Sequence, residues 1–239
     1  MTAERPFTSA IIVAAGSGTR CGGLAKPLIP LYKGKTVFSY VLEAFAACGT
    51  VDEIVVVCKD SSRFEPLLGG VSVVFAPGGA TRAASVYNGV RLTAEDTVLF
   101  LVSGGGSALF ELPFITPEDI RLVCEKAYET GAAAACSPMR DTVKYIEPEK
   151  KVLFTPAREH LIAVATPQVF RREVYLAACA AAKSGPEATD ETTICERIGV
   201  PVAYVPLDSN NMKLTTAYDV KLAKAVCFLA ESERKERRE

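Results

Sequence analysis

The chain has 239 residues, of which 49% are hydrophobic, and its formal net charge at pH 7 is -1. This length and composition suffice for one sizeable core, and we expect a single domain over residues 1–239. The nearly balanced charge argues against a general affinity for nucleic acid or anionic membranes. No apolar run reaches the roughly 18 residues of a membrane helix. The N-terminus also lacks the basic start of a signal peptide, so we expect a cytoplasmic protein.

Eight cysteines and one histidine, His160, limit the metal and nucleophile chemistry that the chain can carry. The cysteines are scattered, without a C-x-x-C pair, so their spacing predicts neither a zinc site nor a disulfide framework. Reduced and mostly buried thiols are expected instead. No G-x-S-x-G segment accompanies His160, so a Ser-His-Asp hydrolase is not indicated.

Short β-branched segments alternate with longer segments of helical periodicity along the chain. This alternation predicts a Rossmann-like α/β fold, with a mostly parallel sheet flanked by helices. Strands are expected at residues 9–15, 52–59, 71–76, 96–102, 132–138 and 201–206. Helices are expected at residues 37–47, 83–92, 117–130, 167–183 and 217–232.

The segment from Thr142 to Thr155 departs from this alternation. Two short apolar runs flank Glu147–Lys151, a charged stretch that contains a proline. This pattern predicts a β-hairpin arm near residues 142–157 that protrudes from the sheet. Such an arm either contacts a partner subunit, covers a site, or is a plain excursion of the chain.

A glycine-rich loop, Ala14-Ala15-Gly16-Ser17-Gly18-Thr19-Arg20, follows the first predicted strand. Consecutive backbone N–H groups with little side-chain obstruction can hold phosphate oxygens. The loop lacks the Gly-Lys-Ser/Thr ending of a P-loop, and Cys21 stands where a dinucleotide fingerprint needs glycine. Two cations, Arg20 and Lys26, come next and suit a triphosphate. Taken alone, the loop is also compatible with a tight turn beside surface cations.

Other motifs follow in a characteristic order. The glycine loop with Lys26-Pro27-Leu28 resembles the opening motif of sugar-phosphate nucleotidyltransferases. The later motifs resemble those of the 2-C-methyl-D-erythritol 4-phosphate cytidylyltransferase family, over nearly the whole chain; ribitol 5-phosphate cytidylyltransferases share most of them. These motifs are Gly78-Gly79-Ala80-Thr81-Arg82, Ser85-Val86-Tyr87-Asn88-Gly89, Asp141-Thr142-Val143-Lys144, Thr166-Pro167-Gln168-Val169-Phe170, Thr189-Asp190-Glu191 and Lys213-Leu214-Thr215-Thr216.

The resemblance implies transfer of CMP from CTP to 2-C-methyl-D-erythritol 4-phosphate, with release of pyrophosphate, in isoprenoid precursor synthesis. It also implies Mg²⁺ as the cofactor and a homodimer formed through the hairpin arm. The implied catalytic residues are Arg20, Lys26 and Lys213. The implied nucleotide contacts are Ala14, Ala15, Gly16, Ser17, Gly18, Thr19, Gly78, Gly79 and Ser85, and the implied acceptor contacts are Thr142, Arg158, Thr166 and Thr189.

This assignment agrees with the chemistry. The attacking phosphate oxygen is already ionised at neutral pH, so cations rather than a general base are required. Several residues also have structural interpretations. Ser85 suits close packing of a helix on the sheet, Lys213 suits an exposed surface, and Thr166 and Thr189 suit helix N-caps.

The loop from Ser103 to Pro113 departs from the family pattern. Family members usually carry a His-Asp-Ala-Ala-Arg-Pro-like segment here, whose aspartate helps to hold Mg²⁺, whereas this loop is longer and has no aspartate. Over about a dozen residues it resembles a loop of glycine-rich glycerate 2-kinases. Glu111 or Asp219 could replace the missing carboxylate, although Asp219 suits a helix cap. The triple glycine suits either a second anion cradle or a flexible connection.

Three alternatives to the methylerythritol phosphate enzyme therefore remain. The first is ribitol 5-phosphate cytidylylation. The second is a nucleotide-binding homologue with impaired turnover, because the metal-binding aspartate is missing. The third is kinase-like phosphotransfer through the segment from Ser103 to Ser107.

Overall fold

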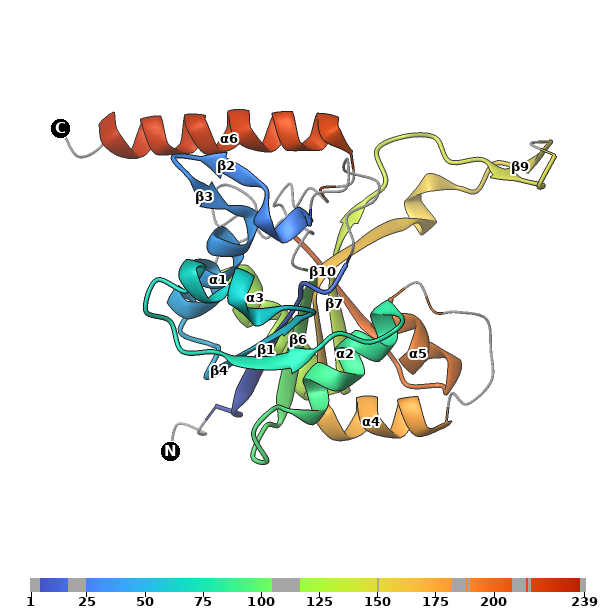
Figure 1. The fold of residues 1–239 in the computed structure, drawn as a ribbon. Coiled ribbons are helices and arrows are strands. Elements are labelled where there is room, and N and C mark those ends of the chain that lie inside the picture. The colour runs from blue at the N-terminus through green and yellow to red at the C-terminus, as the bar shows by residue number, and fades with distance from the viewer. Residues whose placement is uncertain are drawn as a thin grey trace.

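A seven-stranded sheet forms the centre of the computed structural model, which describes residues 5–16, 25–104, 117–149, 151–181, 188, 190–207, 214 and 216–236 (Figure 1). The strand order is β11-β7-β10-β6-β1-β4-β5. Six strands run parallel to one another, and β10 is antiparallel to both of its neighbours. The strands are β1 (Thr8–Val13), β4 (Glu53–Cys58), β5 (Val74–Pro77), β6 (Leu99–Gly104), β7 (Ala132–Pro138), β10 (Ile162–Arg171) and β11 (Ala203–Pro206). The predicted α/β class is confirmed.

Helices cover both faces of the sheet. Helices α1 (Val37–Ala47) and α3 (Pro117–Thr130) pack on one face. Helices α2 (Arg82–Arg91), α4 (Arg172–Ala181) and α5 (Glu191–Arg197) pack on the other. The apolar side chains of β1 explain these two layers, because Ala10 and Ile12 point into one cluster and Ile11 into the other. A strand buried on both faces requires such an unbroken apolar run.

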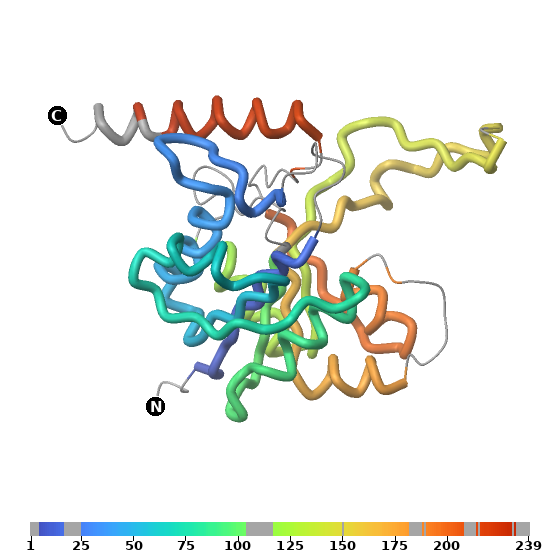
Figure 2. Tube along the Cα trace, viewed as in Figure 1, coloured from blue at the N-terminus to red at the C-terminus, as the bar shows by residue number. Residues whose placement is uncertain are grey.

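The C-terminal helix α6 (Ala217–Glu236) lies across one end of the molecule, away from the N-terminus (Figures 1 and 2). It packs on a small hairpin of β2 (Pro30–Tyr32) and β3 (Lys35–Thr36), which the sequence analysis did not predict. A two-residue turn at Lys33 and Gly34, with φ of 48° and 79°, closes this hairpin. No helix in the described part of the chain is long and apolar enough to cross a membrane.

The helix predicted at residues 167–183 is wrong in its first part. Residues up to Arg171 belong to β10, and α4 begins only at Arg172. Gln168, Val169 and Phe170 are buried between β6 and β7, with both of which β10 pairs. The ladder hydrogen bonds and the packing on two faces outweigh the local helical spacing. The helix N-cap predicted at Thr166 is therefore also wrong, because Thr166 lies inside the strand.

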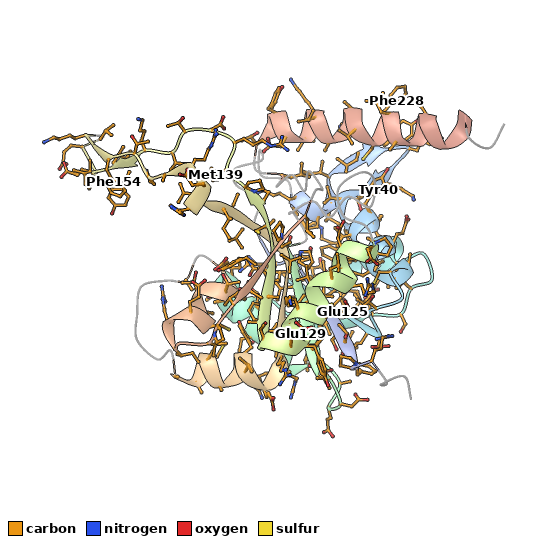
Figure 3. All side chains as sticks on the ribbon, turned by 180° about the vertical axis from the view of Figure 1, so that it is seen from behind. Tyr40, Glu125, Glu129, Met139, Phe154 and Phe228 are labelled. Atoms are coloured by element: carbon orange, nitrogen blue, oxygen red, sulfur yellow. The ribbon has the colours of Figure 1, made fainter. Side chains whose placement is uncertain are left out.

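The predicted hairpin arm is present as β8 (Tyr145–Ile146) and β9 (Val152–Phe154). It projects sideways from the sheet, with Phe154 near its tip and Met139 near its base (Figure 3). The rings of Tyr145 and Phe154 stack at 5.0 Å between centroids, yet 56% and 54% of these residues stay exposed. The arm therefore carries apolar side chains that the chain itself leaves uncovered.

Candidate nucleotide and acceptor site

The loops that follow β1, β4 and β5 meet at one edge of the sheet. The Ala14 N–H donates to the Val57 carbonyl at 2.7 Å, and the Gly78 N–H donates to the Cys58 carbonyl at 3.0 Å. These loops leave the carboxyl ends of parallel strands, where open α/β sheets bind their ligands. The two predicted nucleotide segments, around Ala14 and around Gly78, are thus neighbours in space.

Close packing makes glycine necessary at Gly78 and Gly79. A Cβ atom on Gly78 would lie 2.6 Å from the Cβ of Ala15, and one on Gly79 would lie 2.6 Å from the Cβ of Ala84. By contrast, a Cβ on the exposed Gly16 would meet nothing within 4 Å. The remaining loop residues that were predicted to bind nucleotide lie outside the described residues; these are Ser17, Gly18, Thr19 and the catalytic candidate Arg20.

Ser85 holds the start of α2 against the glycine segment. Its buried hydroxyl accepts a hydrogen bond from the Gly79 N–H at 3.0 Å and donates to the Thr81 carbonyl at 2.9 Å. The packed interpretation of Ser85 thus agrees with the structure. A contact between Ser85 and cytosine stays a prediction. Such a contact would use either the Ser85 hydroxyl or the backbone of the glycine segment that this hydroxyl holds in place.

Lys26 connects the start of the chain to its last segment. Its Nζ donates to the Leu214 carbonyl at 3.0 Å, across 188 residues of sequence. Leu214 is fully buried in a cluster with Ile29 and Val37, which fixes this carbonyl. Lys213, which precedes Leu214 in sequence, lies outside the described residues. An ammonium has three N–H donors, so Lys26 can keep this bond and also donate to a phosphate.

The predicted cap at Asp219 is confirmed. The Thr216 N–H donates to Oδ2 of Asp219 at 2.6 Å, and the Asp219 N–H donates to the Thr216 hydroxyl at 3.2 Å. This reciprocal pair is a capping box at the start of α6. Asp219 thus stabilises the helix that covers the Lys26–Leu214 contact.

Three of the four predicted acceptor residues, Thr142, Arg158 and Thr166, lie within the described part of the chain. Arg158 lies in a short 3-10 turn and donates to the Arg140 carbonyl at 2.8 Å. A shallow hollow there is lined by Arg158, Arg140 and their neighbours, and Thr142 is exposed close by in sequence. Thr166 lies on β10, half-buried, where that strand runs from the arm into the sheet. Thr189 lies outside the described residues, and the N-cap of α5 is Asp190 rather than Thr189.

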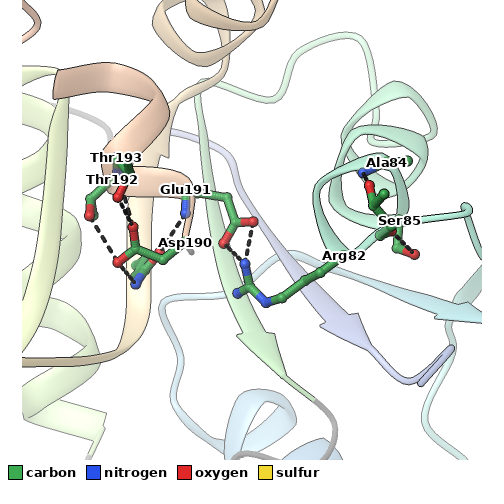
Figure 4. A network of polar contacts seen from close by, with 9 residues as sticks. Arg82, Ala84, Ser85, Asp190, Glu191, Thr192 and Thr193 are labelled. Carbon is green, nitrogen blue, oxygen red and sulfur yellow. Dashed lines mark hydrogen bonds and ion pairs between the residues drawn. The ribbon is translucent and has the colours of Figure 1, made fainter. Parts of the chain in front are cut away.

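A polar network that the sequence did not predict connects the start of α2 to the start of α5 (Figure 4). Arg82, the first residue of α2, donates from Nη1 to both carboxylate oxygens of Glu191, the first residue of α5. The Glu191 N–H donates to Oε1 of Gln168 at 3.3 Å, and Nε2 of Gln168 donates to Asp190 at 3.1 Å. Arg82 and Glu191 stand in the resembling motifs, but nothing local to either residue indicates that they meet.

Burial and hydrogen bonding act differently on the two carboxyls of this network. Burial raises the pKa of Glu191, against the opposing effect of the Arg82 guanidinium. Burial acts in the same direction on Asp190, but the hydroxyl and N–H of Thr193 and the side chains of Thr192 and Gln168 hold the pKa of Asp190 below its ordinary value. The network is therefore most stable with Asp190 ionised.

The described residues do not by themselves form a magnesium site. No group of three or more His, Cys, Asp or Glu side chains assembles within them. Of the two carboxylates proposed as substitutes, Asp219 bonds the Thr216 backbone and Glu111 lies outside the described residues.

The described start of the glycine loop lies at the carboxyl edge of a mostly parallel sheet, which is where α/β proteins that bind nucleotides hold their ligands. The family model for 2-C-methyl-D-erythritol 4-phosphate cytidylyltransferase matches residues 8–228. The chain belongs to this family. It is accordingly a nucleotidyltransferase.

Individual relatives agree with the family assignment. The chain is similar to the 2-C-methyl-D-erythritol 4-phosphate cytidylyltransferase of Symbiobacterium thermophilum, at 36% identity over 90% of both chains. It is 35% identical to the enzyme of that name from Pelotomaculum thermopropionicum, over 91% of this chain and 93% of the relative. Among solved structures, 4-diphosphocytidyl-2C-methyl-D-erythritol synthase from Anaerococcus prevotii superimposes with a TM-score of 0.79 at 26% identity, over 92% of this chain and 95% of that one.

Proposed function

We propose that this chain transfers CMP from CTP to 2-C-methyl-D-erythritol 4-phosphate and releases pyrophosphate, a step of isoprenoid precursor synthesis. Membership of the family supports this activity. The hydrogen bond from Lys26 to the Leu214 carbonyl is the structural observation that supports the proposed site. The Leu214 carbonyl belongs to the residue that follows the predicted catalytic Lys213 in sequence, which supports a shared role for Lys26 and Lys213. The family model and the relatives named above support 2-C-methyl-D-erythritol 4-phosphate as the acceptor rather than the alternative, ribitol 5-phosphate.

The chemistry requires two anions to approach each other. An oxygen of the acceptor phosphate attacks the α-phosphorus of CTP, the bond to the bridging oxygen breaks, and pyrophosphate leaves. Lys26, Arg20 and Lys213 would neutralise the negative charge that gathers on the α-phosphate and on the leaving pyrophosphate. The nucleotide-side segment of Gly78, Gly79 and Ser85 would hold the base, while Thr142, Arg158, Thr166 and Thr189 would hold the acceptor.

We further propose Mg²⁺ as the cofactor. This ion is commonly held in part by substrate phosphates, with one or two protein carboxylates. It would add positive charge to the triphosphate when bound. The triphosphate oxygens would provide most of its ligands here, in keeping with the loop that lacks the family's aspartate.

The exposed arm supports a homodimer. Monomeric proteins rarely leave a contiguous apolar patch uncovered, and the arm leaves both of its strands exposed. We propose that each arm packs on a second copy of the chain, which would also enclose the acceptor residues at its base.

We also propose a domain organisation and a cellular location for this chain. The first is one nucleotidyltransferase domain over residues 1–239. The second is a cytoplasmic location, which is supported by the free thiols of the seven described cysteines. Unpaired thiols are typical of proteins in reducing compartments.

The test is an assay of pyrophosphate release from CTP and Mg²⁺ with each acceptor. We expect release with 2-C-methyl-D-erythritol 4-phosphate and little with ribitol 5-phosphate. CTP binding without pyrophosphate from either acceptor would favour the impaired homologue, and ADP formed from ATP and glycerate would favour the kinase-like alternative.

Substitution of the cations tests the assigned roles. Lys26→Ala and Arg20→Ala should each slow turnover by about two orders of magnitude or more, because each removes charge from the transition state. Lys126→Ala, on the exposed end of α3, is the matched control and should keep full activity. Near-normal turnover in both loop variants would contradict the assignment.

A further inference from the structure

The ion pair of Arg82 and Glu191 joins the first residue of α2 to the first residue of α5 (Figure 4). The Glu191 side chain is 1% exposed and the Arg82 side chain 40%. The two residues are 109 positions apart in sequence. The pair therefore fixes one helix start against the other.

The two helix starts carry different parts of the site. Arg82 belongs to the turn of α2 in which Ser85 accepts the Gly79 N–H, so it is attached to the nucleotide-side segment. Glu191 follows the predicted acceptor contact Thr189 in sequence, after Asp190, and begins α5.

Gln168 extends the connection into the sheet. Its Oε1 accepts the Glu191 N–H, and its Nε2 donates to Asp190. Gln168 is buried on β10, two residues after Thr166, another predicted acceptor contact. The ion pair and two hydrogen bonds thus connect α2, through Glu191, to the two acceptor-side segments, which are the start of α5 and the part of β10 around Thr166 and Gln168.

Among the six ion pairs of the described residues, this one alone has a carboxylate that is almost fully buried. A buried carboxylate that loses its cation is strongly unfavourable, because water cannot replace the partner. Glu191 therefore has one stable arrangement, facing Arg82. A pair with a buried carboxylate therefore constrains the separation of the two helix starts more than an ion pair exposed on both sides does.

We propose that Arg82 and Glu191 are positioning residues, whose ion pair fixes the nucleotide-side segment against the acceptor-side segments and so aligns the two reacting phosphates. This inference rests on the proposed cytidylyl transfer. Attack on phosphorus depends on the distance and angle between two separately bound groups. Loss of the pair should disturb that alignment more than it disturbs the binding of either substrate.

The experiment compares Arg82→Met, Glu191→Gln and the double variant with the native protein, in steady-state assays of pyrophosphate release. The fraction of each protein that binds CTP is measured by equilibrium dialysis and used to normalise kcat. We expect kcat to fall at least tenfold in each single variant, while both KM values stay within about threefold. The double variant should lose no more than the worse single variant, because the two residues act as one unit.

Two further variants separate positioning from general stability. Arg82→Lys keeps the positive charge, so its kcat should be at least threefold higher than that of Arg82→Met. This variant changes a side chain that is partly exposed, so it remains informative if Glu191→Gln fails to fold. Lys126→Met breaks an exposed ion pair on α3 and should leave kcat unchanged.

The inference is overturned if normalised kcat is unchanged, if only one KM rises, or if Arg82→Lys is no better than Arg82→Met. Full additivity in the double variant would also overturn it. Failure of the proposed function has a different signature, because the native protein itself would then release no pyrophosphate.

Discussion

Gly79 lies just before α2 and Gly89 lies in its last turn, and each is confined by its neighbours. A Cβ on Gly79 would press on Ala84 in the turn that shapes the nucleotide-side segment. A Cβ on Gly89 would lie 2.7 Å from Ile11 and 2.8 Å from Val57, where the helix packs on the sheet. The same substitution therefore has different consequences at the two positions.

We expect Gly79→Ala to raise KM for CTP at least tenfold, because the segment that holds the base must move. Gly89→Ala is the matched control and should lower the free energy of unfolding by about 1–3 kcal/mol, the usual cost of overpacking, with little change in KM. Urea unfolding and pyrophosphate assays on both variants measure these effects. A KM for CTP that is equal in the two variants would rule out a specific role for Gly79.

Asp52 shows how one residue ties the N-terminal segment to the sheet. Burial opposes its ionisation, but the Arg5 guanidinium and the Thr8 N–H hold the pKa of its carboxyl below the ordinary 3.8. A carboxyl whose pKa is lower in the folded than in the unfolded chain stabilises the fold above its unfolded pKa. This contribution disappears as pH falls through the folded pKa.

We therefore expect the free energy of unfolding to decrease below about pH 3.8, and to decrease less steeply in Asp52→Asn. Urea unfolding between pH 7 and pH 3 provides the measurement. Asp96→Asn, at an exposed turn, serves as the control and should follow the native curve. If the free energy of unfolding falls with pH equally steeply in the native protein and in Asp52→Asn, Asp52 does not contribute to the loss of stability in acid.

At the scale of elements, the arm exposes apolar side chains on both of its strands. Its strands bond mainly to each other, and the stacked rings of Tyr145 and Phe154 are more than half exposed. A two-stranded ribbon of this kind is marginally stable without a surface to pack on. A second copy of the chain would provide that surface.

We expect the native protein to sediment as a dimer and the Tyr145→Ser, Phe154→Ser double variant to shift toward monomer. Sedimentation velocity over a range of concentrations measures the change. Leu122→Ser removes an exposed apolar side chain from α3 and should leave the dimer intact. A double variant that stays dimeric would place the interface elsewhere on the molecule.

The elements differ in how well the sequence predicts them. The segments at residues 37–47, 117–130 and 132–138 were predicted with their full extents, because their periodicity and flanking residues are local signals. The sequence wrongly predicts a helix over residues 167–171, the end of β10, since the pairing of this strand with β6 and β7 depends on segments far away in sequence. The small β2–β3 hairpin was missed, although Lys33-Gly34 between short apolar runs is a recognisable turn signal.

The candidate site residues were proposed from motifs in the local sequence. The assignments of the glycine loop, Gly78-Gly79 and Lys26 stay predictions. Local sequence could not predict the Leu214 carbonyl as the partner of Lys26, nor the burial of Glu191 against Arg82. Both depend on how distant segments pack, which residue spacing within either segment does not encode.

At the scale of the whole molecule, the sheet consists of two parallel parts that β10 joins. Strands β5, β4, β1 and β6 form one part, and β7 with β11 forms the other. The two parts have no strand pairing with each other except through β10. The alignment of the nucleotide-side and acceptor-side segments is therefore a property of the complete sheet.

The position of β10 also sets an order for assembly on the ribosome. Residues 8–104 contain every strand of the first part, so these strands can pair while the rest of the chain is still being made. Strand β7 cannot join them until residue 171 has emerged and β10 can insert beside β6. The Lys26–Leu214 contact forms later still. A nascent chain can thus complete the pairing of its sheet before the Lys26–Leu214 contact of the proposed site forms.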